Sequence, residues 1–312
     1  MKEKLKEILS LQKDTFQDWN KRDPFRQSAV IAYYAIFSMP GLLVLIITIM
    51  GYFFNKDAVS QRILSEIANT MGGDTSTEIK SMLANAGQTK ATILGSIIGI
   101  ATLLVGATGV FIALQKTLNM IWEVEVTAKK GGVWPILKSR VFSFGLILAI
   151  AFLLLISLVL STATAAVGEW IRIDTSDLLI TVFNILNLII SFGIITILFA
   201  LMFKVLPDVK IKWKYIWPGA ILTSFLFTIG KTALSFYFSK ATPESVYGAG
   251  GSVILILLWV TYSSMILFFG AEFTHIYSIK YGEKPKPTEI ANSTHEETEQ
   301  EQDEAVVKNY TS

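Results

Sequence analysis

Residues 251–279 read GSVILILLWVTYSSMILFFGAEFTHIYSI, and this stretch decides the class of fold. Its only Asp, Glu, Lys or Arg residue is Glu272. The hydrocarbon core of a bilayer needs about 20 apolar helical residues, whereas a soluble amphipathic helix keeps one polar face. The stretch therefore predicts a transmembrane helix.

Five further stretches have the same character. They are approximately 28–54, 91–114, 141–167, 178–206 and 215–238. Of the 312 residues, 52% are hydrophobic and only 17% are charged, against about 25% charged in ordinary soluble domains. The sequence therefore predicts an all-α, polytopic membrane bundle with six transmembrane helices in residues 28–279.

The distribution of Lys and Arg predicts the orientation. Segments 1–27, 115–140 and 204–214 and the tail from residue 280 hold 20 of these residues. The intervening loops, 55–90, 168–177 and 239–250, hold 6. Positive residues favour the cytoplasmic side, which places both termini in the cytoplasm. Six spans, an even number, agree with that placement.

The segments before and after the predicted bundle, residues 1–27 and 280–312, are more polar than the bundle itself. Residues 1–27 predict a cytoplasmic amphipathic helix, with Leu5, Ile8, Leu9, Phe16 and Trp19 near one face. Two interpretations stay open for it: the helix lies on an anionic leaflet, or it packs on the protein's own loops. Residues 280–312 carry eight acidic residues and few large apolar ones, which predicts a disordered acidic cytoplasmic tail.

Three local patterns refine the bundle. Pro40 lies within the first span and predicts a kink there. Loop 55–90 contains two short amphipathic repeats separated by glycines, which predict two short helices. In the second span, small residues fall on one face and favour close helix packing over a pathway lining or a dimer seam. The glycines among them are Gly95, Gly99, Gly106 and Gly109.

Two ionisable residues, Lys231 and Glu272, lie inside predicted spans. A charge near the bilayer centre costs at least about 2.5–3.5 kcal/mol, so such residues are candidates for function. The predicted directions of their helices put Lys231 in the outer part of the membrane and Glu272 near the inner face. We therefore expect each to have its own partners rather than to pair with the other.

Residues at matching depth are the expected partners. They are Asn184 and Asn187 for Lys231, and Arg140 and Lys204, as inner-face charge partners, for Glu272. Two simpler alternatives stay open. Lys231 can extend to the headgroups, and Glu272 can belong to a structural ion pair near the interface.

The turn before the last span contains Gly248, Gly250, Gly251 and Ser252. Backbone N–H groups at such a helix start can bind an anion, although a tight turn alone also explains the glycines. No nucleotide-binding, metal-binding or nucleophile-base motif accompanies it. We therefore expect no catalytic residues, no metal, no cofactor and no enzymatic activity. A net charge of +2 gives no basis for a nucleic-acid partner.

Several short motifs are spread over the predicted bundle. They are Ala32-Tyr-Tyr-Ala-Ile-Phe-Ser-Met-Pro40, Ala113-Leu-Gln-Lys-Thr-Leu-Asn-Met-Ile-Trp122, Leu206-Pro207, Trp217-Pro-Gly-Ala220, Tyr247-Gly-Ala-Gly-Gly-Ser252, Leu258-Trp259 and Gly270-Ala-Glu272. Together they resemble the YihY/BrkB family of bacterial inner-membrane proteins. The resemblance implies six inner-membrane helices with cytoplasmic termini. Members carry labels of a virulence factor and of ribonuclease BN, and the residues above give the ribonuclease label no support.

Two function hypotheses follow. The first is a transporter or flippase-like protein that handles envelope lipids or amphiphiles. Its polar pathway would comprise Tyr33, Tyr34, Asn184, Asn187, Lys231 and Glu272. The alternative is a non-transporting membrane scaffold that recruits partners through its terminal segments. Membrane lipids are the expected partners, and no motif assigns an oligomeric state.

Overall fold

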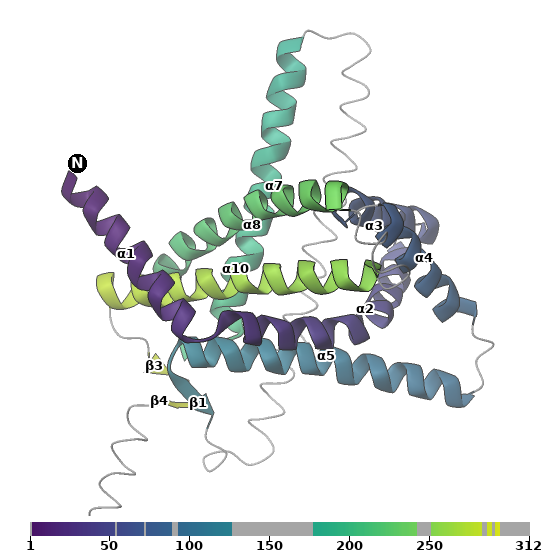
Figure 1. Ribbon diagram of the computed structural model, residues 1–312, viewed down its shortest axis with the longest axis horizontal. Coiled ribbons are helices and arrows are strands. Elements are labelled where there is room, and N and C mark those ends of the chain that lie inside the picture. The colour runs from purple at the N-terminus through teal and green to yellow at the C-terminus, as the bar shows by residue number, and fades with distance from the viewer. Residues whose placement is uncertain are drawn as a thin grey trace, which may run out of the picture. The chain divides into compact units, whose positions relative to one another are not determined.

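The computed structural model describes residues 2–53, 55–71, 73–88, 93–126, 177–241, 251–282, 286–288 and 291–293. Helices dominate these residues (Figure 1). The helices are α1 (Lys2–Lys21), α2 (Pro24–Phe53), α3 (Lys56–Met71), α4 (Gly73–Gln88), α5 (Ile93–Ile121), α7 (Asp177–Val205), α8 (Trp213–Ala241) and α10 (Gly251–Tyr281). The strands are β1 (Val124–Val126), β2 (Val209–Lys210), β3 (Lys286–Pro287) and β4 (Ala291–Ser293).

The helices fit a membrane protein. Among the described residues, segments of α7, α8 and α10 are long and apolar enough to cross a bilayer, and α2 is a fourth if its two bent halves form one span. Helix α5 has helical backbone over the second predicted span, whereas the third, 141–167, lies outside the described residues. The helical architecture is confirmed, while six spans and cytoplasmic termini stay predictions.

The bend in α2 confirms the predicted kink. Segments Pro24–Met39 and Gly41–Thr48 meet at 51°, with Pro40 between them. Proline lacks an N–H group and its ring clashes with the preceding turn, so a helix bends there.

The two short helices expected in loop 55–90 are also confirmed, as α3 and α4. Asn55 caps α3, because its Oδ1 accepts hydrogen bonds from the backbone N–H groups of Asp57 (2.8 Å) and Ala58 (3.3 Å). The Ser76 hydroxyl donates to the Leu64 carbonyl at 2.8 Å and ties α4 to α3.

The chain forms two compact units. The first comprises Met1–Arg22, Gln115–Ser224 and Phe268–Ser312, and the second comprises Asp23–Leu114 and Phe225–Leu267. The core of the first unit contains Leu118, Phe203, Ile216 and Phe268, all nearly inaccessible. The core of the second unit gathers Ile79, Phe238, Leu255 and Ile256, with side chains of α2, α3 and α4 packed around them.

Helix α5 lies close against α2 within the second unit. A Cβ atom at Gly106 would lie 2.8 Å from the Ser38 Cβ, and one at Gly109 would overlap the ring of Tyr34. Only glycine allows the two backbones to approach this closely. Gly95 and Gly99 lie on the same helix, but outside the part whose contacts are described.

Part of the C-terminal tail forms strands, which corrects the expectation of disorder from residue 280. Strand β3 pairs antiparallel with β2, and β4 pairs antiparallel with β1. The backbone N–H of Thr288 also donates to the Asp208 carbonyl at 3.0 Å. Strands β1 and β2 have backbone donors and acceptors that need partners, and the tail supplies them. Residues 294–312 lie outside the described residues.

Candidate functional site

Helices α8 and α10 pack in the first unit through a reciprocal glycine-threonine crossing. A Cβ at Gly219 would overlap the Thr274 hydroxyl, and a Cβ at Gly270 would overlap the Thr223 hydroxyl. Each threonine also donates to the glycine carbonyl one turn earlier in its own helix, Thr223 to Gly219 at 2.6 Å and Thr274 to Gly270 at 2.7 Å. The crossing fixes the part of α10 that carries Glu272.

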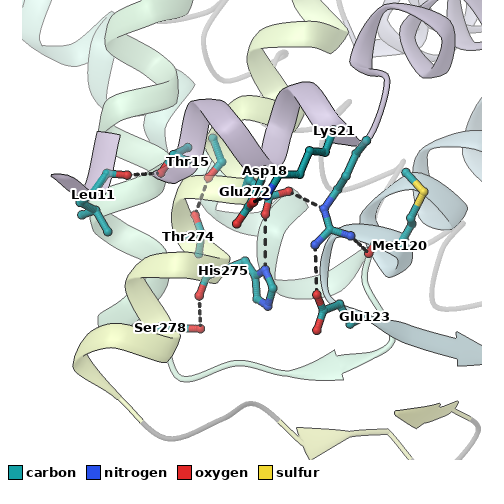
Figure 2. Close-up of polar contacts among 12 residues, drawn as sticks. Leu11, Thr15, Asp18, Lys21, Met120, Glu123, Glu272, Thr274, His275 and Ser278 are labelled. Atoms are coloured by element: carbon teal, nitrogen blue, oxygen red, sulfur yellow. Dashed lines mark hydrogen bonds and ion pairs between the residues drawn. The ribbon is translucent and has the colours of Figure 1, made fainter. Parts of the chain in front are cut away.

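Four side chains form what we call the Arg22 cluster: Arg22, Glu123, Glu272 and His275 (Figure 2). Arg22 Nε lies 3.0 Å from Glu272 Oε2, and Arg22 Nη2 lies 3.2 Å from Glu123 Oε1. Arg22 Nη1 donates to the Met120 carbonyl at 2.6 Å. His275 Nδ1 lies 3.6 Å from Glu272 Oε1, one turn along α10. One guanidinium thus contacts two carboxylates and a backbone carbonyl.

Local backbone structure brings these groups together. Arg22 follows the last turn of α1, where its N–H donates to the carbonyls of Asp18 and Trp19. Glu123 follows the end of α5 with a φ of 53°, in the left-handed region that ends helices. The carbonyls in the last turn of α5 have no partner within the helix, so Met120 can accept from a cation.

Burial distinguishes this cluster from a surface ion pair. The side chain of Glu272 is 1% exposed, whereas that of Arg22 is 22% exposed. A buried carboxylate is tolerated only when opposite charge and hydrogen bonds compensate for lost water. Arg22 supplies the charge, but its Nε and the Glu272 oxygens are not aligned as a hydrogen bond.

Hydrogen-bonding capacity is therefore left over around Glu272. In the described part of the chain, six buried polar atoms in or beside the cluster have no hydrogen-bond partner. They are Trp19 Nε1, Arg22 Nε, Trp122 Nε1, Glu272 Oε1, Glu272 Oε2 and His275 Nδ1. The Trp122 ring lies 5.0 Å from that of His275, between ring centroids. Donors and acceptors this close together can bind a polar group that enters the cluster.

Asp208 forms a second polar site in the first unit, between α7 and α8. Its Oδ2 accepts hydrogen bonds from Gln115 Nε2 at 3.0 Å and from Asn119 Nδ2 at 2.8 Å. Its backbone N–H donates to Asn119 Oδ1 at 2.8 Å. Burial raises the pKa of the Asp208 carboxyl above its usual 3.8, and the two amide hydrogen bonds partly oppose that rise. These bonds join the end of α5 to the segment that leads into α8.

Among the described side chains, Lys231 pairs with Glu66, a residue that the sequence did not indicate as its partner. In the second unit its Nζ lies 2.5 Å from Oε1 of Glu66 on α3. The two side chains are 40% and 56% exposed. Asn184 and Asn187 lie on α7, but their side chains are outside the described part of the structure.

Of the two partners expected for Glu272, Lys204 has other contacts in the described part of the chain. Lys204 donates to the Ile211 carbonyl, and its Nζ lies 5.9 Å from the Trp213 ring centroid. Arg140 lies outside the described residues. Sequence reasoning found Glu272 but missed Arg22. The one feature that could have indicated Arg22 is its position just before Pro24, where α1 ends and α2 begins.

The remaining predicted residues are more dispersed. In the second unit Tyr33 is 59% exposed, and Tyr34 packs against Gly109. Gly251 and Ser252 form the buried first residues of α10, whereas Gly248 and Gly250 lie outside the described residues. Within the described ranges, no three His, Asp or Glu side chains are grouped as ligands for a metal ion.

Comparison with known proteins identifies the family to which this chain is similar. The sequence profile of the family described as Virulence factor BrkB matches residues 15–294. A UPF0761 membrane protein of Teredinibacter turnerae is 25% identical over 266 residues, which are 85% of this chain and 60% of that protein. A UPF0761 membrane protein of Saccharophagus degradans is 28% identical over 248 residues, 80% of this chain and 55% of that protein.

A third relative has a length closer to this chain. It is a Bacillus subtilis protein named ribonuclease-like, YfkH, with 23% identity over 269 residues, 85% of this chain and 94% of that protein. The chain thus spans less than two thirds of the first two relatives and nearly all of the third. No solved structure matches.

Proposed function

Because the chain belongs to the Virulence factor BrkB family of membrane proteins, we propose that it is a multi-pass protein of the bacterial inner membrane that moves a lipid or other amphiphile across it. The Arg22 cluster is the observation that carries this proposal. No catalytic reaction is part of it.

The argument starts from the energetics of the cluster. Charged groups in the membrane part of a protein are costly, and they mark substrate and ion pathways more often than they add stability. Glu272 is fully buried on an otherwise apolar helix, and Arg22 beside it is partly accessible. A guanidinium binds the phosphate of a lipid headgroup with two parallel hydrogen bonds. In this proposal Arg22 receives an anionic headgroup, and the two glutamates hold its side chain in position.

Of the pathway predicted from sequence, the proposal relies on Glu272 and adds Arg22. The proposal gives Lys231 no direct part in binding the headgroup, because this residue pairs with Glu66 and is well exposed. Tyr33 and Tyr34 stay in the proposed pathway as polar groups of α2, together with Asn184 and Asn187 of α7.

The test is transfer of headgroup-labelled lipid in proteoliposomes. Wild-type protein should accelerate transfer of phosphatidylglycerol between leaflets, and Arg22→Gln should slow it by at least about tenfold, the effect of losing about 1.4 kcal/mol of interaction. Arg26→Gln is the matched control, because this arginine is 71% exposed and, in the described part of the chain, forms its ion pair with Asp23 one turn away. It should leave transfer unchanged.

Two results would contradict the proposal. One is wild-type protein that transfers neither anionic nor zwitterionic lipids. The other is an Arg22→Gln variant that is folded, present at wild-type levels and as active as the control.

A membrane scaffold is the second candidate, and the tail strands favour it. The β1–β4 pair is two-stranded in the described part of the chain, so its outer edges can accept a strand from a partner. Removing residues 283–312 should then abolish recruitment of that partner while the helices stay folded. Under the transport proposal, lipid transfer should persist in the same truncated protein.

A further inference from the structure

Helix α1 packs on the end of α10 through one of its faces. Thr15 is fully buried on this face, and the Trp19 ring contacts that of Phe269 at 5.8 Å between centroids. Towards the start of α1, Glu7 accepts a 2.7 Å hydrogen bond from the Tyr281 hydroxyl. Helix α1 and the part of α10 from Phe268 onward both belong to the first unit, so α1 is already anchored to the protein on this side.

A different face of α1 exposes large apolar side chains. Leu9 is 61% exposed and Phe16 is 56% exposed. Seven residues apart, they project about 20° from each other, and they lie about 100–160° around the helix from buried Leu11 and Thr15. The Phe16 ring borders the packed face, with its centroid 5.7 Å from that of Trp19, and more than half of the side chain stays exposed.

The charges of α1 are sorted relative to this face. Exposed Lys6 and Lys13 project within about 80° of Leu9 and Phe16, whereas Glu7 and Asp14 project about 140–180° away. Lys21, in the last turn, projects about 120–140° away and pairs with Asp18. Cations beside an apolar face and anions opposite it are typical of helices that lie in an anionic lipid interface. A soluble partner would not require this separation.

The path of the chain keeps α1 near the membrane. Only Arg22 and Asp23 separate the end of α1 from Pro24, the first residue of α2. Three Cα–Cα steps reach at most about 11 Å. Pro24 begins α2, whose two bent halves together are long and apolar enough for one span. Lys21, the last residue of α1, is therefore held within that distance of the start of α2.

We propose that α1 is an interfacial helix: Leu9 and Phe16 insert into the headgroup region of the leaflet beside it, and Lys6 and Lys13 select anionic lipids. This surface is separate from the Arg22 cluster, and it does not depend on lipid transfer. In this proposal both interpretations of the helix from the sequence apply, because one face packs on the protein and the other lies on lipid.

The experiment uses the absence of cysteine from the chain. Leu9→Cys and Phe16→Cys are each spin-labelled in the full-length protein, in nanodiscs of phosphatidylcholine with or without phosphatidylglycerol. Asp14→Cys, an exposed site on another face, is the matched control. In anionic nanodiscs, the ratio of oxygen to water-soluble nickel accessibility should be at least about threefold higher at positions 9 and 16 than at position 14.

The role of the lysines is tested in the same background. Lys6→Gln together with Lys13→Gln should lower the ratio at position 16 in anionic nanodiscs and leave it unchanged in neutral ones. Labels at 9 and 16 that match position 14 would overturn the proposal. Labels shielded from both oxygen and nickel would show a protein contact, such as a second copy, and overturn the lipid assignment. Equal ratios in the two lipid mixtures would overturn the selection by lysine.

Discussion

The Arg22–Glu272 pair and the Lys231–Glu66 pair have similar chemistry and different surroundings. Glu272 is 1% exposed, and Arg22 also contacts Glu123 and the Met120 carbonyl. Lys231 and Glu66 are 40% and 56% exposed. Water and salt weaken an ion pair that is exposed to them, whereas a buried pair has a large desolvation cost and each of its charges depends strongly on the other. The comparison teaches that environment rather than charge decides which pair the fold depends on.

The largest expected effect comes from leaving Glu272 without its cation. Arg22→Met should reduce the free energy of unfolding by about 3–5 kcal/mol, because a buried carboxylate then lacks an opposite charge. Denaturant titration in detergent, followed by circular dichroism, measures the change. Arg26→Met is the control, and the double variant Arg22→Met/Glu272→Gln should recover part of the loss. If Arg22→Met were as stable as Arg26→Met, the buried Arg22–Glu272 pair would matter no more to stability than an exposed pair.

A smaller effect should follow from moving α10 without altering any charge. Gly270→Ala places a methyl group against Thr223 and should cost about 1–3 kcal/mol through overpacking. Gly193→Ala on α7 is the matched control, because no described residue lies within 4 Å of the added Cβ. The control should be neutral or slightly stabilising, since alanine favours helix. Equal stability of the two variants would show that the crossing is not tightly packed.

Asp208 should produce a modest dependence of stability on pH. Its folded-state pKa is raised, so the folded protein holds this proton more tightly than the unfolded chain does. The contribution to stability is therefore complete below pH 3.8 and is lost as pH rises through the folded-state pKa. Asp208→Asn should remove this slope from thermal unfolding curves. Gln115→Leu deletes a hydrogen bond that lowers the pKa, so it should extend the slope to higher pH.

The smallest effect is expected at the exposed pair. Lys231→Gln should change the free energy of unfolding by at most about 1 kcal/mol, and added salt should shrink the difference further. Unfolding at low and high ionic strength, with Glu66→Gln as the reciprocal variant, gives both values. If Lys231→Gln lowered the free energy of unfolding as much as Arg22→Met, lipid or protein would have to shield this pair from water. The two pairs would then not differ in their surroundings.

The sequence predicted the helices better than the site. Apolar runs, Pro40 and the glycine break in the loop after the first span are local signals, and α2, α3 and α4 follow from them. Arg22 and Glu123 are 101 residues apart in the sequence. Their contact depends on the left-handed backbone conformation of Glu123 after the end of α5, which no sequence pattern predicts. Glu272 was detected because it is a lone charge in an apolar stretch.

Two other features were beyond sequence reasoning for similar reasons. Strands β3 and β4 contain two and three residues, too few to show an alternating pattern, and backbone pairing with β1 and β2 orders them. Gly219 and Gly270 were visible as glycines within motifs. Their reciprocal fit with Thr274 and Thr223 depends on the relative position of two helices, which no single helix encodes.

The reciprocal crossing has a consequence for how the first unit can change shape. With no space between Gly219 and Thr274 or between Gly270 and Thr223, α8 and α10 must shift as one body over this stretch. Glu272 then stays fixed relative to α8. Helix α1 packs on the end of α10 through Trp19, so Arg22 is carried with the same body.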